Sequence, residues 1–224
     1  MTIVREEQVN NAIAADAAAD RLRRWGRSTT RDELAGIPVV PAAFLRHAHA
    51  IARLDTDGEI GNAGLIHVYG YLRSEAETPY GPKHARWTGG AIARALGLEP
   101  AALLPGDGPS TPIEVLTPIL EGILAAPPAG ARIVDETGEG LRARTVLLPG
   151  GAVAGGSGAL LVYGVDDGAA DDGATGRLRP VTVFPIADPA GALAEIEAES
   201  PRLRYNAVDG RGRAMTPLGT RRVR

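Results

Sequence analysis

The pattern of apolar residues changes at Pro127 and Pro128, and this change limits the architecture more than any other feature of the chain. Before it, apolar residues recur at spacings of three and four, which is typical of amphipathic helices. After it, short runs alternate between apolar and polar residues and are separated by glycine-rich turns, which is typical of antiparallel strands. The sequence therefore predicts an α+β fold, in which a helical N-terminal half, to about residue 126, packs on a mainly antiparallel β-sheet.

Proline and glycine mark the ends of the expected helices. Pro41, Pro82 and Pro112 suit the first turn of a helix, because the N–H that proline lacks has no helical partner there. Gly26 and Gly97 suit the position just beyond a helix, where the backbone often turns left-handed. These signals predict helices over residues 4–25, 41–54, 82–97 and 112–125.

Residues 63–77 fit two structures. As a strand, they alternate cleanly and place His67, Tyr69 and Tyr71 on one face. As a helix, they carry an apolar stripe at positions 65, 68, 69, 72 and 76, with Asn62 as a suitable N-cap. We favour the helix because its stripe extends further along the chain than the alternation does. The strand stays as the alternative.

The second half contains the strand signals. We expect strands over residues 132–134, 141–148, 159–165, 178–186 and 203–208, and one late helix that Asp188 caps and that ends near Ser200. Residues 166–176 are rich in Asp and Gly, so we expect a flexible loop there, and the arginine-rich residues 211–224 suggest a mobile tail. We expect a single domain over residues 1–224, in which residues 1–126 are helical and residues 130–210 form the sheet.

Composition excludes several classes of protein. The chain has no cysteine, which rules out disulfides and thiolate sites, and its net charge of −3 offers no general attraction for nucleic acid. No apolar run is long enough for a membrane span, and the first residues are too polar for a signal peptide. We therefore expect a cytoplasmic protein. The thin apolar stripe of residues 4–25 suits a peripheral helix, which could also pack on a second copy of the chain.

Residues 67–87 form the candidate functional segment. Four of the nine aromatic residues fall within or next to its glycine and proline turns, together with two histidines. Side chains that donate, accept and stack are those a small-molecule site needs. We assign catalytic roles to His67, Tyr71, Lys83 and His84, and substrate binding to Tyr69, Arg73, Tyr80, Arg86 and Trp87.

Three of these residues have specific chemistry. His67 can act as a general base near neutral pH, and Tyr71 can donate a hydrogen bond to an oxyanion. Lys83 can bind a carboxylate or phosphate, or form an imine if it is desolvated. It is the only lysine among 24 basic residues, which indicates that an ammonium group is needed at this position. The alternative is that the segment packs helices and carries an ordinary polar turn.

Histidine clustering raises the question of a metal. His47 and His49 are two residues apart on an expected helix, so their side chains diverge and cannot chelate one ion. His67 and His84 could form a site with Glu75 or Glu77, but nothing in their spacing requires it. We predict that the protein binds no metal and no cofactor.

The sequence favours an intracellular enzyme that acts on a small polar or anionic metabolite by acid–base chemistry, as a lyase, isomerase or hydrolase does. The dominance of arginine over lysine is typical of a GC-rich bacterial genome. One alternative is a non-catalytic small-molecule-binding or assembly protein that uses the same surface. A second alternative is a metal-dependent enzyme with histidine ligands.

Overall fold

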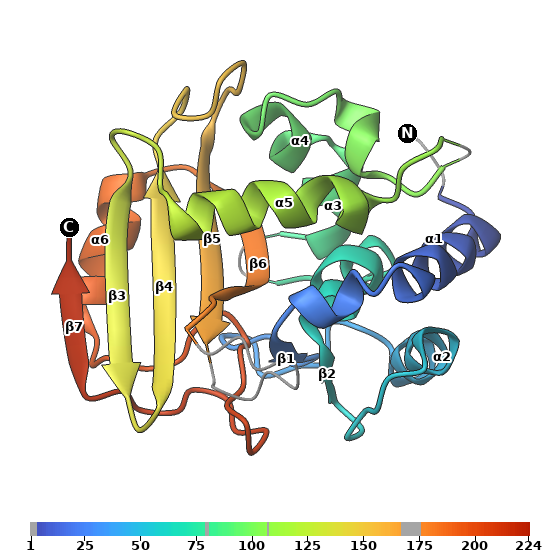
Figure 1. Cartoon of the computed structure of the whole chain (residues 1–224), viewed down its shortest axis with the longest axis horizontal. Helices are drawn as coiled ribbons and strands as arrows, with labels where there is room; N and C mark the ends of the chain where they lie inside the picture. Colours follow the sequence, from blue (N-terminus) through green and yellow to red (C-terminus); the bar gives the residue numbers. More distant parts are fainter. Residues whose placement is uncertain (1–3, 79–80, 107, 167–175) are drawn as a thin grey trace.

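The computed structural model describes residues 4–78, 81–106, 108–166 and 176–224. It confirms the α+β prediction: helices occupy the N-terminal half, and the second half forms a five-stranded antiparallel sheet in the order β6-β5-β4-β3-β7 (Figure 1). The strands are β3 (Arg132–Gly138), β4 (Leu141–Leu148), β5 (Ala159–Asp166), β6 (Arg179–Ile186) and β7 (Thr220–Val223). The interior of the expected loop at 166–176 lies outside the described residues.

Two helices cover the two faces of this sheet. In Figure 1, α5 (Pro112–Ala125) crosses in front of the strands and α6 (Pro189–Ala198) lies behind them. The bounds of α5 agree with the prediction because its N-terminus is a complete capping box. Thr111 Oγ1 accepts a hydrogen bond from Glu114 N at 3.0 Å, and Thr111 N donates to Glu114 Oε2 at 3.4 Å.

The remaining helices form a second body of structure beside the sheet (Figure 1). They are α1 (Glu6–Ala18), η1 (Leu22–Arg24), α2 (Ala42–Ala52), η2 (Leu65–Gly70), α3 (Lys83–Thr88), α4 (Ala91–Ala95) and η3 (Pro100–Leu103). The single helix predicted over 82–97 is in fact two, α3 and α4. Gly90 is left-handed, with φ of +67°, and this conformation ends one helix and starts the next.

Of the ambiguous residues 63–77, the first ten are helical, as we favoured, but the helix ends at Leu72 and residues 74–77 have no regular structure. Asn62 Oδ1 accepts a hydrogen bond from Leu65 N at 3.2 Å, which is the expected N-cap contact. Within this helix, η2 is a π-helix, a form that is rare overall but is often found at functional sites. A side chain at Gly70 would lie 2.9 Å from the Val40 side chain, so this turn requires glycine to pack.

Three features of the strands differ from the predictions. Residues 203–208 make only isolated bridges, because their polar groups bond to loops and side chains instead of to a neighbouring strand. A short sheet of β1 (Arg27–Thr29) and β2 (Ile60–Asn62) joins the helices and was not predicted. The expected mobile tail ends in β7, which pairs with β3 and is held there by Arg221 bonding to Glu136.

The glycine-rich turn between β4 and β5 packs backbone against backbone on the end of α4. A Cβ atom at Gly97 would lie 2.5 Å from the Ala154 carbonyl oxygen, and one at Gly156 would lie 2.2 Å from that of Ala95. Ser157 N donates to Arg94 O at 2.9 Å. The glycines of this turn therefore allow a close contact between the sheet and the helical body.

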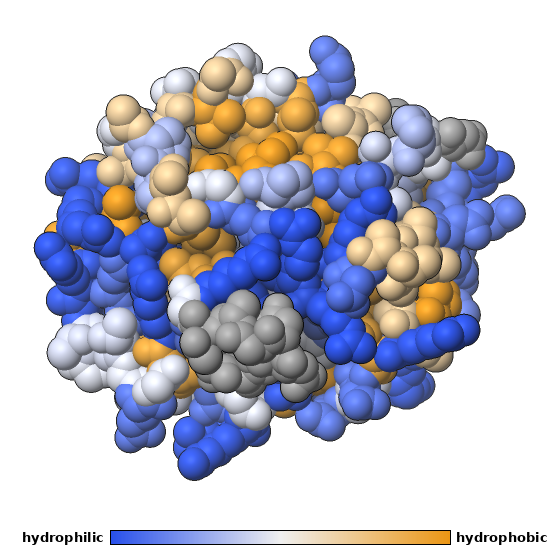
Figure 2. All heavy atoms as spheres, viewed as in Figure 1, coloured by the Kyte–Doolittle hydropathy of each residue, from blue (hydrophilic) through white to orange (hydrophobic). Residues whose placement is uncertain are grey.

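Figure 2 shows the face of the molecule that carries α5, with apolar side chains gathered toward its top and hydrophilic ones across its middle and bottom. Among the described residues, no helix is both long and apolar enough to cross a membrane.

Candidate functional site

Three of the predicted catalytic side chains come together between η2 and the start of α3. The rings of His67 and Tyr71 meet edge to face, with centroids 4.8 Å apart, and Lys83 Nζ lies 5.6 Å from the centre of the Tyr71 ring. All three side chains are buried. We call these three side chains and their polar neighbours the His67 cluster; its members are Ser28, Asp32, His67, Tyr71, Lys83 and Asn206.

One ring nitrogen of His67 forms a hydrogen bond and the other does not. Nε2 lies 2.8 Å from Ser28 Oγ, which is itself 3.0 Å from the Asn206 carbonyl oxygen. A serine hydroxyl has one hydrogen, so its bond to that carbonyl requires Nε2 to carry the imidazole hydrogen. Nδ1 then holds a lone pair, and it has no hydrogen-bond partner although it is buried.

The surroundings keep His67 neutral. Burial lowers its pKa to about 3, and the positive charges of Lys83 and Arg86 act in the same direction. The imidazole is therefore unprotonated throughout the physiological pH range, and the lone pair of Nδ1 is available as an acceptor.

Tyr71 is held as a hydrogen-bond donor. Its hydroxyl oxygen accepts a bond of 3.2 Å from the Asn206 side-chain amide, which leaves the phenolic hydrogen for a second partner. Burial raises the pKa of Tyr71 well above its ordinary value, and the nearby negative charge of Asp32 acts in the same direction. The phenol therefore stays protonated.

Lys83 forms a buried ion pair. Its Nζ lies 2.6 Å from Asp32 Oδ2, and both side chains are less than a tenth exposed. Burial lowers the pKa of Lys83, although the Asp32 carboxylate opposes this shift. Burial alone would raise the pKa of Asp32, but hydrogen bonds from Lys83 and from the backbone of Ala35 and Leu34 lower it overall. A compact ammonium group fits between the carboxylate and the Tyr71 ring, which explains why lysine is used here.

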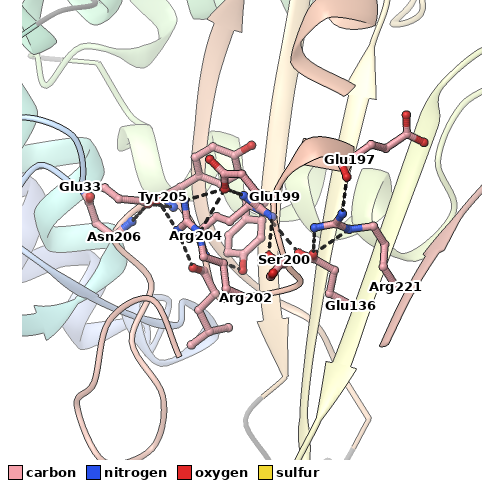
Figure 3. Close-up of polar contacts among 12 residues, drawn as sticks. Glu33, Glu136, Glu197, Glu199, Ser200, Arg202, Arg204, Tyr205, Asn206 and Arg221 are labelled. Carbon is pink, nitrogen blue, oxygen red and sulfur yellow. Dashed lines mark hydrogen bonds and ion pairs between the residues drawn. The ribbon is translucent and has the colours of Figure 1, made fainter. Parts of the chain in front are cut away.

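The Asn206 side of the cluster has a strained backbone. Tyr205 and Asn206 are both left-handed, with φ of 57° and 65°, a conformation that costs free energy for residues other than glycine. Glu33 holds them in place: its Oε2 accepts bonds from Tyr205 N at 2.6 Å and from Asn206 N at 3.4 Å (Figure 3). Arg202 pairs with the other oxygen of Glu33.

A buried ion network ties this segment to the sheet (Figure 3). Arg204 Nε lies 3.4 Å from Glu136 Oε2, and Arg221 Nη2 lies 2.7 Å from Glu136 Oε1. Arg204 also pairs with Glu199. Glu136 is the most buried of these groups. Its two ion pairs connect β3 to β7 and to the residues that precede Asn206.

Several other predicted residues make their contacts elsewhere. His84 Nδ1 lies 2.9 Å from the Ser74 carbonyl oxygen. Tyr69 projects to the other side of η2, where its hydroxyl donates to buried Asp16, and Arg73 lies 3.9 Å from Glu6 at the surface. The described contacts of these three side chains are therefore not with the His67 cluster.

The last three predicted residues differ in how they relate to the cluster. Arg86 lies over the Phe184 ring at 5.4 Å, yet its charge is close enough to lower the pKa of His67. Trp87 is buried in the core. Tyr80 lies outside the described residues.

Sequence reasoning missed Ser28, Asp32 and Asn206. Asp32 carried a usable signal, because an Asp shortly before a glycine is typical of a turn that the carboxylate caps. Ser28 and Asn206 are 178 residues apart and meet only through the fold, so their pairing could not be predicted from spacing.

The described residues contain no group of three or more His, Asp or Glu side chains that could hold a metal ion, so the suggested site of His67, His84 and a glutamate does not assemble there. Comparison with known proteins adds no identity: no family model, no curated protein and no solved structure matches this chain.

Proposed function

We propose that the protein is an intracellular bacterial enzyme that transfers protons on a small anionic metabolite at the His67 cluster. The observation that carries this proposal is the buried, unpartnered Nδ1 of His67, whose ring contacts the ring of Tyr71, while Lys83 Nζ lies over that same tyrosine ring. Buried polar atoms without a partner are uncommon, and a catalytic role or a bound water or ion is among their explanations.

The chemistry follows from the protonation states. A substrate proton would pass to His67 Nδ1, while the negative charge that develops on a substrate oxygen would be stabilised by the Tyr71 hydroxyl and the Lys83 ammonium. Lyases and isomerases that abstract a proton next to a carbonyl use this arrangement of one acceptor and two donors. Ser28 is a positioning residue, because its bond to Nε2 fixes the ring and its tautomer.

The substrate's own charge would assist the base. In the free protein, Lys83 and Arg86 disfavour protonated His67. An anion bound between Lys83 and the imidazole offsets their charge and raises the pKa of His67 toward a useful value. This argument favours anionic over neutral substrates.

The test is a screen of pooled small carboxylic and phosphorylated metabolites, with loss of each compound followed by mass spectrometry. We expect turnover by the wild type and a loss of tenfold or more in His67→Gln, with kcat affected more than KM. His84→Gln is the matched control, because His84 bonds to Ser74 outside the cluster. Equal turnover by His67→Gln and the wild type would remove the proposed base.

A second candidate function is ligand binding without catalysis. It is favoured by the pKa of about 3 for His67, because such an imidazole accepts a hydrogen bond readily but holds a proton poorly. Binding of a metabolite that is recovered unchanged, and that is weakened by His67→Gln, would identify this function.

A further inference from the structure

The turn at residues 32–38 is anchored to the His67 cluster by two acidic side chains, and its large apolar side chains do not hold it. Asp32 and Glu33 are its inward anchors, to Lys83 and to the Tyr205–Asn206 backbone respectively. Its two large apolar side chains point to solvent, with Leu34 60% and Ile37 42% exposed. Exposed apolar groups contribute nothing to hold a turn down, so the ion pairs set how firmly it is closed.

The turn also carries its own hydrogen bonds. Asp32 N donates to Ile37 O and Gly36 N donates to Asp32 O, while Asp32 Oδ1 accepts from Leu34 N and Ala35 N at 3.1 and 2.9 Å. These bonds lie within the turn and would persist if it moved outward. The Asp32 carboxylate is joined to the rest of the cluster by one bond, which Lys83 Nζ donates to Oδ2.

At Lys83 itself, exchange of this one bond is nearly balanced in free energy, so the bonds of Glu33 to Tyr205 N, Asn206 N and Arg202 are the main contacts that outward movement must break. If Asp32 moves into water, its carboxylate regains hydration, and a carboxylate from solution that takes its place keeps Lys83 paired. The total charge of the buried cluster is unchanged. Opening without a ligand is costly in contrast, because Lys83 would lose its counter-ion.

We propose that Asp32 occupies the subsite for the carboxylate of the ligand, and that a small carboxylate displaces it from Lys83 as the turn at 32–38 moves outward. This inference rests on the proposed function and names its substrate class. The subsite matches a carboxylate better than a phosphate, because a dianion would bring a second negative charge that Lys83 does not neutralise.

Lys83 supplies a direct assay, because it is the only lysine in the chain. Acetylation of Lys83 by an amine-reactive ester is followed by peptide mass, which separates it from the α-amino group. In the wild type, we expect sodium formate to slow this acetylation at least threefold relative to sodium chloride at the same ionic strength, because formate takes the place of Asp32. Sodium phosphate should act like chloride.

Urea and two variants complete the design. Local opening of the turn predicts that acetylation of Lys83 is insensitive to urea below the unfolding transition. Asp32→Asn removes the charge that holds the turn and should speed acetylation tenfold or more. Asp57→Asn, which alters an exposed pair with Arg27, is the matched control and should have no effect.

Two outcomes in the wild type overturn the inference: formate that protects Lys83 no better than chloride, or acetylation that follows global unfolding in urea. Neither depends on whether a variant folds. Protection by formate without turnover of any carboxylate would support the carboxylate subsite and contradict the proposed enzymatic function. Unchanged turnover in Lys83→Met would support an enzymatic function and contradict the carboxylate subsite at Lys83.

Discussion

Replacing Lys83 with methionine should destabilise the protein substantially, because it leaves a buried carboxylate without its cation. Asp32 Oδ2 lies 2.6 Å from Lys83 Nζ, and the Asp32 side chain is 6% exposed. Breaking a buried ion pair costs about 3–5 kcal/mol. Asp32 keeps two backbone hydrogen bonds, and its turn can carry it into water, so we expect the lower end of this range, about 3 kcal/mol.

The assay is urea unfolding followed by fluorescence, since Trp25 and Trp87 are both buried. Asp32→Asn is measured in the same way, together with the double variant, so that the coupling free energy between the two side chains is obtained from a cycle. The exposed pair of Arg27 and Asp57 is the control, and its coupling should not exceed about 1 kcal/mol.

The reasoning fails if Lys83→Met costs less than about 1 kcal/mol and the coupling between Lys83 and Asp32 equals that of the surface pair. Lys83→Arg should also destabilise, because the larger planar guanidinium does not fit the space that the ammonium occupies. For this reason a loss of activity in Lys83→Arg must be compared with its unfolding free energy.

Further predictions concern the rest of the fold and use the same unfolding assay. Glu136→Gln should cost about 3 kcal/mol, because it leaves the buried Arg204 and the partly buried Arg221 without their shared carboxylate; a cost near zero would show that the network adds nothing. Gly97→Ala should destabilise by more than about 1 kcal/mol, because φ is +70° and the new methyl group meets a carbonyl oxygen, whereas Gly122→Ala has open space in α5 and should stabilise by about 0.5–1 kcal/mol. The lowered pKa of His67 means that the unfolded chain binds an extra proton between about pH 6.5 and pH 3. The free energy of unfolding should therefore decrease as the pH is lowered through that window, and it should decrease less steeply in His67→Gln.

The elements predicted best are those with local signals. The bounds of α5 and β4 were predicted from a proline that suits the first turn of a helix and from two-residue alternation, which depend only on neighbouring residues. β6 lies at an edge of the sheet, which is where a strand with two prolines is tolerated. β1 and β7 were missed because each is short and is formed by pairing with a strand far away in the sequence.

The candidate site was predicted incompletely for the same reason. His67, Tyr71 and Lys83 were found because they fall within one short polar and aromatic segment, and one helical turn brings the rings of His67 and Tyr71 together. The strand predicted at 203–208 failed because Asn206 adopts a left-handed backbone, which hydrogen bonds to distant residues such as Glu33 stabilise. The charge, tautomer and burial of a site depend on such distant partners, so no local pattern reveals them.

The account rests on the state of one imidazole, and a nitrogen-15 NMR titration of His67 tests it most directly. We predict the neutral tautomer with hydrogen on Nε2 and a lone pair on Nδ1, unchanged from pH 8 down to about pH 4. An anionic substrate should shift the Nδ1 signal toward the protonated form. A hydrogen on Nδ1 in the free protein, or a pKa near the ordinary value of about 6.5, would contradict the account.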